Sequence, residues 1–314
     1  MERIIGHKVI KEYFTKVLEH KKLAHSYIFE GQEGVGRNSV ANVIAKSLLC
    51  LNGTKPCNTC SACHQFDVHT HPDIIRIDKD ARSIKIDVIR KYVVRELSVK
   101  PYQSEYKVIV VNHAEALTVE SQNALLKAIE DPPSYGVIIF ITNNIDMLLP
   151  TIKSRCIHIR FSGLTDEEVK SCIKSGSKAI IKFANGSIGV AKRLVEDEDF
   201  KELRAKSVEF LSRLETADIM QLYDIVNNVV KQVEILDFWI LWYRDLLLYK
   251  STGSRDLYYA DYERMLVDMA TGLNYHTISD NLDNIQTAKL DILANSYALF
   301  VIENLLLRLK GSWR

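Results

Sequence analysis

The segment from residue 26 to residue 49 constrains the fold of this chain more than any other, because an apolar run there leads into a glycine-rich turn and then into a helical pattern. Gly31, Gly34 and Gly36 lie in the turn, and the spacing of Gly31 and Gly36 is that of the motif GxxxxGK[ST]. Backbone N–H groups at the start of such a helix bind phosphate groups. The segment therefore predicts a parallel α/β domain with a phosphate-binding loop.

Two residues of this loop depart from the motif. Arg37 stands in place of the lysine that contacts the terminal phosphates, and Asn38 stands in place of the hydroxyl that ligates magnesium. A guanidinium is a planar fork rather than a compact ammonium, so the replacement changes the phosphate contact. We expect a degenerate nucleotide site that does not hydrolyse ATP. Weak binding of ATP or ADP stays open, and so does a turn without any ligand.

The apolar run Lys107–Asn112 shows a second departure. In a working NTPase of this class, such a strand ends in an acidic pair that holds magnesium and polarises the attacking water. Here the pair reads Asn112 and His113, and Glu115 lies two residues further on. An amide and a neutral imidazole are poor replacements for two carboxylates, so magnesium-dependent hydrolysis is not expected.

The first half of the chain alternates apolar runs with helical patterns, which is typical of parallel strands joined by helices. Several runs are almost continuously apolar, as strands covered on both faces should be. Beyond residue 163 only helical periodicity remains. The predicted strands lie at 26–30, 74–77, 107–112, 137–142 and 156–161.

This change of pattern predicts three domains. An α/β domain is expected at 1–163, with a cysteine-rich insertion at 50–63. A small helical domain follows at 164–207 and an all-α domain at 208–314. With 314 residues the chain is long enough for two or three separate cores.

Composition limits the classes of function. Hydrophobic residues make up 47% and charged residues 26%, and the net charge is +1, which is typical of a soluble globular protein. The N-terminal residues lack the apolar run of a signal peptide, and no apolar stretch is long enough to cross a membrane. We expect a cytoplasmic protein without membrane contact. A basic run at 76–107 is either a solvated helix face or a DNA-facing surface.

Cys50, Cys57, Cys60 and Cys63 are spaced C-x6-C-x2-C-x2-C, directly after the helix that follows the phosphate loop. Four thiolates at such short spacing can bind a tetrahedral zinc ion, and a reducing compartment disfavours disulfides. Four protein ligands leave no position for substrate, so the predicted zinc is structural. Free thiols and a redox pair are the alternatives.

With these motifs in place, the chain resembles the AAA+ clamp-loader family, and within it the delta-prime subunits of bacterial DNA polymerase III. The resemblance covers residues 1 to about 160, and the helical remainder matches the family only in its layout. The segments that carry it are Ile4–His7, Leu23–Tyr27, Ala124–Pro133 and Leu148–Cys156.

The resemblance implies a role for single residues. In the family, the Ser-Arg-Cys triplet supplies an arginine finger to the ATP of an adjacent subunit, which places that role on Arg155. A guanidinium near a γ-phosphate neutralises charge that develops in the transition state, and it can come from another subunit. The γ-phosphate sensor is expected at Thr142, and the second sensor arginine is missing near Ile188 and Gly189.

The resemblance also implies an assembly. The α/β domain becomes an AAA+ domain, the domain at 164–207 its lid, and the domain at 208–314 a collar that joins subunits. We expect a ring with ATP-binding gamma/tau-like subunits and a delta-like subunit, which loads a sliding clamp onto primer-template DNA. Two alternatives stay open: an active motor ATPase with unorthodox loop residues, and a zinc-stabilised scaffold without a role for Arg155 in a neighbour.

Overall fold

The computed structural model describes residues 4–53, 56–80, 83–173, 178–227, 232–294 and 296–312. The chain divides into two compact units, one formed by Met1–Cys172 with Asn185–Val190 and the other by Ile173–Ala184 with Ala191–Arg314. The three-domain boundaries expected from the sequence stay a prediction.

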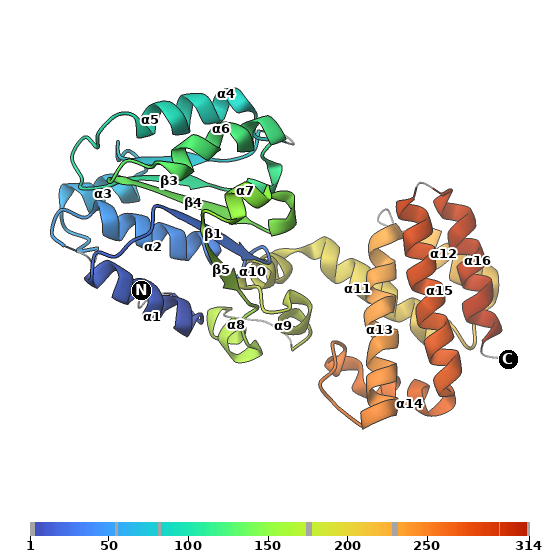
Figure 1. Ribbon diagram of the computed structural model, residues 1–314. Coiled ribbons are helices and arrows are strands. Elements are labelled where there is room, and N and C mark those ends of the chain that lie inside the picture. Colours follow the sequence, from blue (N-terminus) through green and yellow to red (C-terminus); the bar gives the residue numbers. More distant parts are fainter. Residues whose placement is uncertain are drawn as a thin grey trace. The chain divides into compact units, whose positions relative to one another are not determined.

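The first unit is built on a five-stranded parallel sheet with the order β2-β3-β4-β1-β5 (Figure 1). Strand β1 (Ser26–Gly31) lies between β4 and β5, so Tyr27 pairs with Ile139 on one side and with Ile157 on the other. This register brings the carboxyl ends of β1, β3 and β4 to the same edge of the sheet. The other strands are β2 (Ile74–Ile77), β3 (Lys107–Val111), β4 (Gly136–Thr142) and β5 (Ile157–Phe161).

Helices cover both faces of this sheet and make a three-layer unit. One core contains Phe14 of α1 and Ile44 of α2, and the other contains Leu125 of α6 and Ile152 of α7. All seven residues of β4 are buried, which explains its unbroken apolar sequence. The helical elements of this unit are α1 (Lys8–Glu19), α2 (Arg37–Leu49), α3 (Ser61–Asp67), α4 (Ile86–Ile89), the π-helical η1 (Arg90–Val94), α5 (Arg95–Leu97), η2 (Ala114–Ala116), α6 (Val119–Glu130), η3 (Ile145–Met147), α7 (Pro150–Lys153) and α8 (Asp166–Cys172).

The second unit is helical. Its core is centred on Trp239, Trp242 and Tyr243, which are fully buried, and Trp239 stacks on Phe210 with 4.1 Å between ring centroids. Helix α10 (Ile188–Glu196) begins in the first unit and continues into this one. The remaining helical elements are α9 (Lys178–Ala184), α11 (Glu198–Arg213), α12 (Ile219–Asn227), α13 (Gln232–Thr252), η4 (Ala260–Tyr262), α14 (Glu263–Gly272), α15 (Tyr275–Leu293) and α16 (Ala298–Gly311).

The structure confirms the predicted strands to within one residue at each end. Helix α7 starts at Pro150, because the proline holds the preceding residue in an extended conformation. Thr165 caps the start of α8, since its Oγ1 accepts the N–H of Glu168 at 3.2 Å. Among the described residues, none of the helices combines the length and the apolar character needed to cross a bilayer.

Candidate functional site

The glycine-rich loop joins β1 to α2 at the carboxyl edge of the sheet, as the sequence predicts. Another segment of the first unit packs directly on it: Ser187 Oγ donates to the carbonyl of Glu33 at 2.8 Å, and the Gly189 N–H donates to the carbonyl of Gly34 at 3.0 Å. Gly34 has φ +76°, and a Cβ there would lie 2.3 Å from Ser187 Oγ. Only glycine fits this close contact between the loop and the segment at the start of α10.

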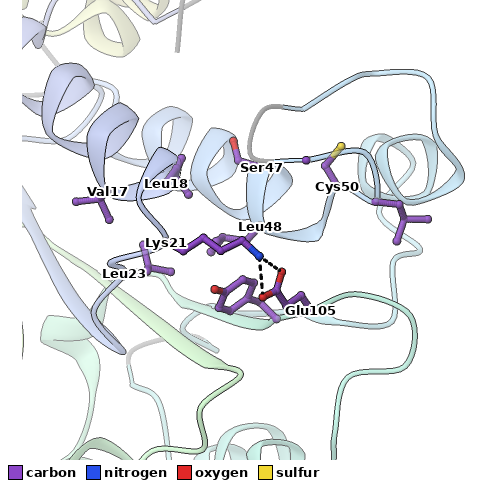
Figure 2. A pocket seen from close by; sticks show the side chains of 11 residues that line it. Val17, Leu18, Lys21, Leu23, Ser47, Leu48, Cys50 and Glu105 are labelled. Carbon is purple, nitrogen blue, oxygen red and sulfur yellow. Dashed lines mark hydrogen bonds and ion pairs between the residues drawn. The ribbon is translucent and has the colours of Figure 1, made fainter.

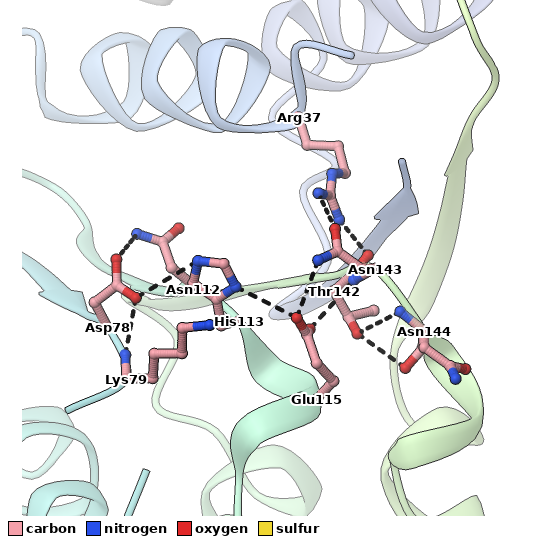
Figure 3. A network of polar contacts seen from close by, with 9 residues as sticks. All are labelled: Arg37, Asp78, Lys79, Asn112, His113, Glu115, Thr142, Asn143 and Asn144. Atoms are coloured by element: carbon pink, nitrogen blue, oxygen red, sulfur yellow. Dashed lines mark hydrogen bonds and ion pairs between the residues drawn. The ribbon is translucent and has the colours of Figure 1, made fainter. Parts of the chain in front are cut away.

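Arg37, the first residue of α2, turns its side chain into the protein (Figure 3). The residue is only 7% exposed, and its guanidinium donates to the carbonyl of Thr142 and to the side-chain oxygen of Asn143. Burial lowers the pKa of Arg37, while the charges of Glu115 and Glu33 oppose that change. The cation that stands in the lysine position is thus hydrogen-bonded within its own chain. Asn38, the next residue, is exposed.

Glu115 completes this polar network from the 3-10 turn η2. Its carboxylate accepts the backbone N–H and the side-chain amide of Asn143, each at 3.2 Å, and lies 3.3 Å from Nδ1 of His113. Burial by itself favours the protonated acid, but these hydrogen bonds and a contact with Thr142 outweigh it and lower the pKa of Glu115. A half-buried carboxylate therefore faces the guanidinium across the side chain of Asn143.

Asn112 and His113, which replace the acidic pair, lie directly after β3, as the sequence predicts. Asn112 Nδ2 donates to Asp78 Oδ2 at 3.3 Å, and His113 Nε2 lies 3.8 Å from Asp78 Oδ1. Asp78 directly follows β2, and Asn143 directly follows β4. Neither was singled out from the sequence, although polar residues that follow parallel strands converge at one edge of a sheet.

Thr142 ends β4 and is fully buried. Its hydroxyl donates to the carbonyl of Asn144 at 2.9 Å and accepts the Asn144 N–H at 3.1 Å, while its carbonyl accepts from Arg37. The structure thus joins Arg37 and Thr142, two residues of the predicted nucleotide site, by a direct hydrogen bond. Both are satisfied by neighbours in the same unit.

Arg155 lies at the amino ends of the strands, opposite the glycine-rich loop. It precedes β5, and the register of β5 with β1 places it two residues before the level of Tyr27, whereas the loop begins at Gly31. Six residues of strand correspond to roughly 20 Å, so the side chain of Arg155 does not reach the loop of its own chain. Its Nη2 lies 2.8 Å from Glu130 Oε1, and its Nη1 donates to the carbonyl of Thr151 at 2.9 Å.

The four clustered cysteines converge as their spacing predicts. Their Sγ atoms all lie within 4.8 Å of one another, and those of Cys57 and Cys63 are 3.9 Å apart. Ligands at 2.3 Å in a tetrahedron are separated by about 3.8 Å, so the cluster has the dimensions of a metal site. Backbone N–H groups donate to three of the sulfurs: Cys57 to Cys50, Cys60 to Cys57 and Cys63 to Cys60. Such donors stabilise thiolates.

The thiols differ in acidity in the absence of a metal. Hydrogen bonds from Thr59 and from the Cys60 N–H lower the pKa of Cys57 to about 5, whereas burial raises the pKa of Cys63 to about 12. A metal ion that binds all four sulfurs at neutral pH therefore displaces at least one proton.

A pocket of about 330 Å³ lies beside this cluster, between α1 and the end of α2 (Figure 2). Lys21 and Glu105 form an ion pair of 3.0 Å within it, and Cys50 contributes to its wall. None of the residues of the predicted nucleotide site lines this pocket. It offers no support for nucleotide binding.

The basic run at 76–107 is divided by the fold. Lys107 is buried and its Nζ donates to the carbonyl of Glu96 at 3.0 Å, while the guanidinium of Arg76 lies 4.8 Å from the ring centre of Phe66. Lys107 therefore belongs to the interior of the unit, whereas Arg76 is exposed and packs on an aromatic ring. Arg82 lies outside the described residues, and the others of the run, Lys79, Lys85, Arg90, Lys91, Arg95 and Lys100, keep DNA contact as a prediction.

Comparison with known proteins identifies the family of the chain. Residues 6–165 match the family described as DNA polymerase III, delta subunit. The chain belongs to this family. The match starts at Gly6 and covers the phosphate loop, the cysteine cluster and Arg155, so the family resemblance inferred from the sequence motifs is confirmed.

One relative extends the likeness into the helical part of the chain. The DNA polymerase III subunit delta' of Bacillus subtilis is 26% identical over 96% of this chain and 95% of its own length, so the chain is a delta-prime-like clamp-loader protein. A DNA polymerase III subunit gamma of Buchnera aphidicola is 32% identical over 62% of this chain, but this match spans only 57% of that protein.

A solved structure, the DNA polymerase III gamma subunit-related protein of Thermotoga maritima, has the same fold. It aligns with 96% of this chain and 99% of its own length at a TM-score of 0.50 and 18% identity. The predicted fold class is therefore confirmed: an AAA+ sheet domain with a cysteine-cluster insertion, followed by helical parts.

The polar network makes a prediction about stability. We expect Glu115→Gln to lower the free energy of unfolding by about 1–2 kcal/mol at pH 7, because hydrogen bonds to a charged acceptor are weakened. The pKa of Glu115 is lower in the folded protein, so its contribution is fully present above the unfolded pKa of about 4.5 and is lost as the pH falls through the folded value. Urea unfolding from pH 7 to pH 3 measures this.

The control for that experiment is Glu105→Gln, which removes an exposed ion pair with Lys21 and should change stability little at any pH. A difference between wild type and Glu115→Gln that stays constant down to pH 3 would contradict the assigned network.

Proposed function

We propose that this protein is a clamp-loader subunit that hydrolyses no ATP itself and supplies Arg155 to the ATP site of a neighbouring subunit. The partners are gamma/tau-like ATP-binding subunits and a delta-like subunit in a hetero-oligomeric ring, and the ring loads a sliding clamp onto primer-template DNA in the cytoplasm. The observation that carries the proposal is the state of the two arginines. Arg37 is buried, whereas Arg155 is accessible to solvent although it too has partners in its own chain, Glu130 and Thr151.

Three features support the loss of hydrolysis. The guanidinium of Arg37 is already bonded to Thr142 and Asn143, so a nucleotide would have to break these contacts before its phosphates gained the charge. The magnesium-binding acidic pair is replaced by Asn112 and His113. The segment at Gly189 meets the loop through its backbone and offers no sensor arginine. The degenerate nucleotide site thus keeps the backbone shape of a phosphate loop but lacks the groups that hydrolyse ATP. Its residues are Gly31, Gly34, Gly36, Arg37, Asn38 and Thr142.

Two features support a role for Arg155 in a neighbour. The residue lies roughly 20 Å along the strands from the loop of its own chain, which excludes action on that loop. Its side chain is 38% exposed next to β5, which is an edge strand of the sheet. A charged group on an accessible edge can reach a second subunit, where it would neutralise charge on the phosphate in the transition state.

Zinc is the proposed cofactor of the cluster formed by Cys50, Cys57, Cys60 and Cys63. Four sulfurs at tetrahedral dimensions suit zinc, and with four protein ligands the ion would be structural. When bound, it would link the end of α2 to α3, since Cys50 follows the former and Cys63 lies in the latter.

The role of Arg155 is tested by Arg155→Ala in an assembly reconstituted with gamma-type and delta-type subunits. We expect ATP turnover at the neighbouring site to fall by on the order of 10³-fold, as when other arginines supplied by a second subunit are removed. Arg213→Ala is the control, because Arg213 forms a comparable exposed ion pair with Glu209 in α11. Wild-type turnover in the Arg155→Ala assembly would favour the scaffold without such a role.

The loss of hydrolysis is tested on the isolated chain. We expect no magnesium-dependent release of phosphate from ATP above the background of a buffer control, because the loop lacks its lysine and its magnesium ligands. A turnover that disappears in Arg37→Ala would instead support the active motor ATPase.

The zinc site is tested by metal analysis of the purified protein. We expect about one zinc ion per chain, lost on dialysis with a chelator or on acidification, because protons compete with the metal for the thiolates. Cys60→Ser should reduce the metal content and destabilise the first unit, whereas Cys172→Ser, at a cysteine outside the cluster, should do neither. A metal-free wild-type protein would refute the assignment.

A further inference from the structure

We infer that Glu130 is a positioning residue for Arg155, holding its guanidinium in the orientation in which it meets the neighbouring subunit. This inference rests on the proposed role of Arg155 and assigns a function to a carboxylate that the sequence motifs leave unexplained. Arg155 Nη2 lies 2.8 Å from Glu130 Oε1, although the two residues come from separate elements.

The backbones on both sides of this ion pair are fixed by one core. Glu130 is the last residue of α6 and follows the buried Ile129, while Arg155 follows α7, whose Ile152 is fully buried. Ile129 and Ile152 belong to the same hydrophobic cluster on one face of the sheet, and Cys156 packs against it. The separation of the two charged residues is therefore set by packed elements and not by a chance meeting of two flexible side chains.

The end of α6 is also fixed by sequence. Asp131 precedes Pro132 and adopts a non-helical conformation, as the residue before a proline does, so the helix cannot continue past Glu130. An acidic residue at a helix C-terminus is unfavourable with respect to the helix dipole. Glu130 thus occupies a position that does not stabilise α6, which points to its partner as the reason for the carboxylate.

The guanidinium is held on a second side by α7. Its Nη1 donates to the carbonyl of Thr151 at 2.9 Å and lies 3.3 Å from Ser154 Oγ. The carbonyl of Thr151 is in the last turn of a four-residue helix, where carbonyls lack partners within the helix. Arg155 is therefore tethered at both terminal nitrogens, one to α6 and one to α7.

The pair is not a device for stability. The Arg155 and Glu130 side chains are 38% and 48% exposed, and ion pairs that open to solvent contribute little to folding. What the pair restricts is the freedom of a long side chain. A free arginine would lose rotamer freedom each time it engaged a phosphate, whereas a tethered one has already lost it.

The test is a double-mutant cycle in the reconstituted assembly. We expect Glu130→Ala to lower kcat for ATP roughly three- to tenfold, which corresponds to ordering one long side chain, with KM unchanged. Glu130→Gln, which keeps the length and one acceptor, should fall between wild type and Glu130→Ala. In an Arg155→Ala background, Glu130→Ala should have no further effect, because Glu130 acts only through that arginine.

The matched control is Glu209→Ala, which removes another exposed glutamate–arginine pair, and size-exclusion chromatography confirms that each variant still assembles. If Arg155→Ala lowers kcat but Glu130→Ala leaves it unchanged, raises it, changes KM alone or adds to the effect of Arg155→Ala, the positioning role is wrong and the arginine role stands. If Arg155→Ala itself has no effect, the proposed function fails and the positioning role fails with it.

Discussion

The parallel pairing of β1 with β4 on one side and β5 on the other is the constraint on which the rest of the first unit depends. It brings the residues after β1, β3 and β4 together at the carboxyl ends of the strands. It leaves Arg155, which precedes β5, at the amino ends. Arg37 and Arg155 are separated by this register and not by their places in the sequence. One chain can therefore hold the buried Arg37 at the carboxyl ends of the strands and the accessible Arg155 at the amino ends.

At the carboxyl ends of the strands, the cation of the glycine-rich loop is hydrogen-bonded by groups of its own chain. The loop positions the guanidinium of Arg37. Its hydrogen-bond acceptors are the carbonyl of Thr142 and the side-chain oxygen of Asn143. Glu115, in the 3-10 turn η2, supplies the negative charge, and the side chain of Asn143 links it to the guanidinium. The guanidinium is buried and needs acceptors, and here the guanidinium, the amide and the carboxylate satisfy one another.

The sequence predicts those parts of the fold that depend on local pattern. The strands, the phosphate loop and the cysteine cluster follow from apolar runs, glycine spacing and thiol spacing, which act over short distances. Asp78, Asn143 and Glu130 were not found, because each acquires its partner only when separate elements meet across the sheet or between helices. The direction of the Arg37 side chain was not predictable either, since the motif specifies the residue but not its acceptors.

The same difference appears in the helices. The buried positions of α13 follow its aromatic spacing, but Phe300 in α16, which shares the apolar periodicity of that helix, is 64% exposed. Periodicity identifies a helix and its apolar face, whereas the neighbours that cover the face depend on the fold.

The buried guanidinium has a consequence for substitutions at position 37. A lysine at position 37 would bring one ammonium where a two-pronged donor now serves two acceptors, and Asn143 or Thr142 would lose a partner. Asn112 and His113 would still lack the carboxylates for magnesium. Under the proposed function, a change at position 37 alone would therefore loosen these contacts without restoring hydrolysis.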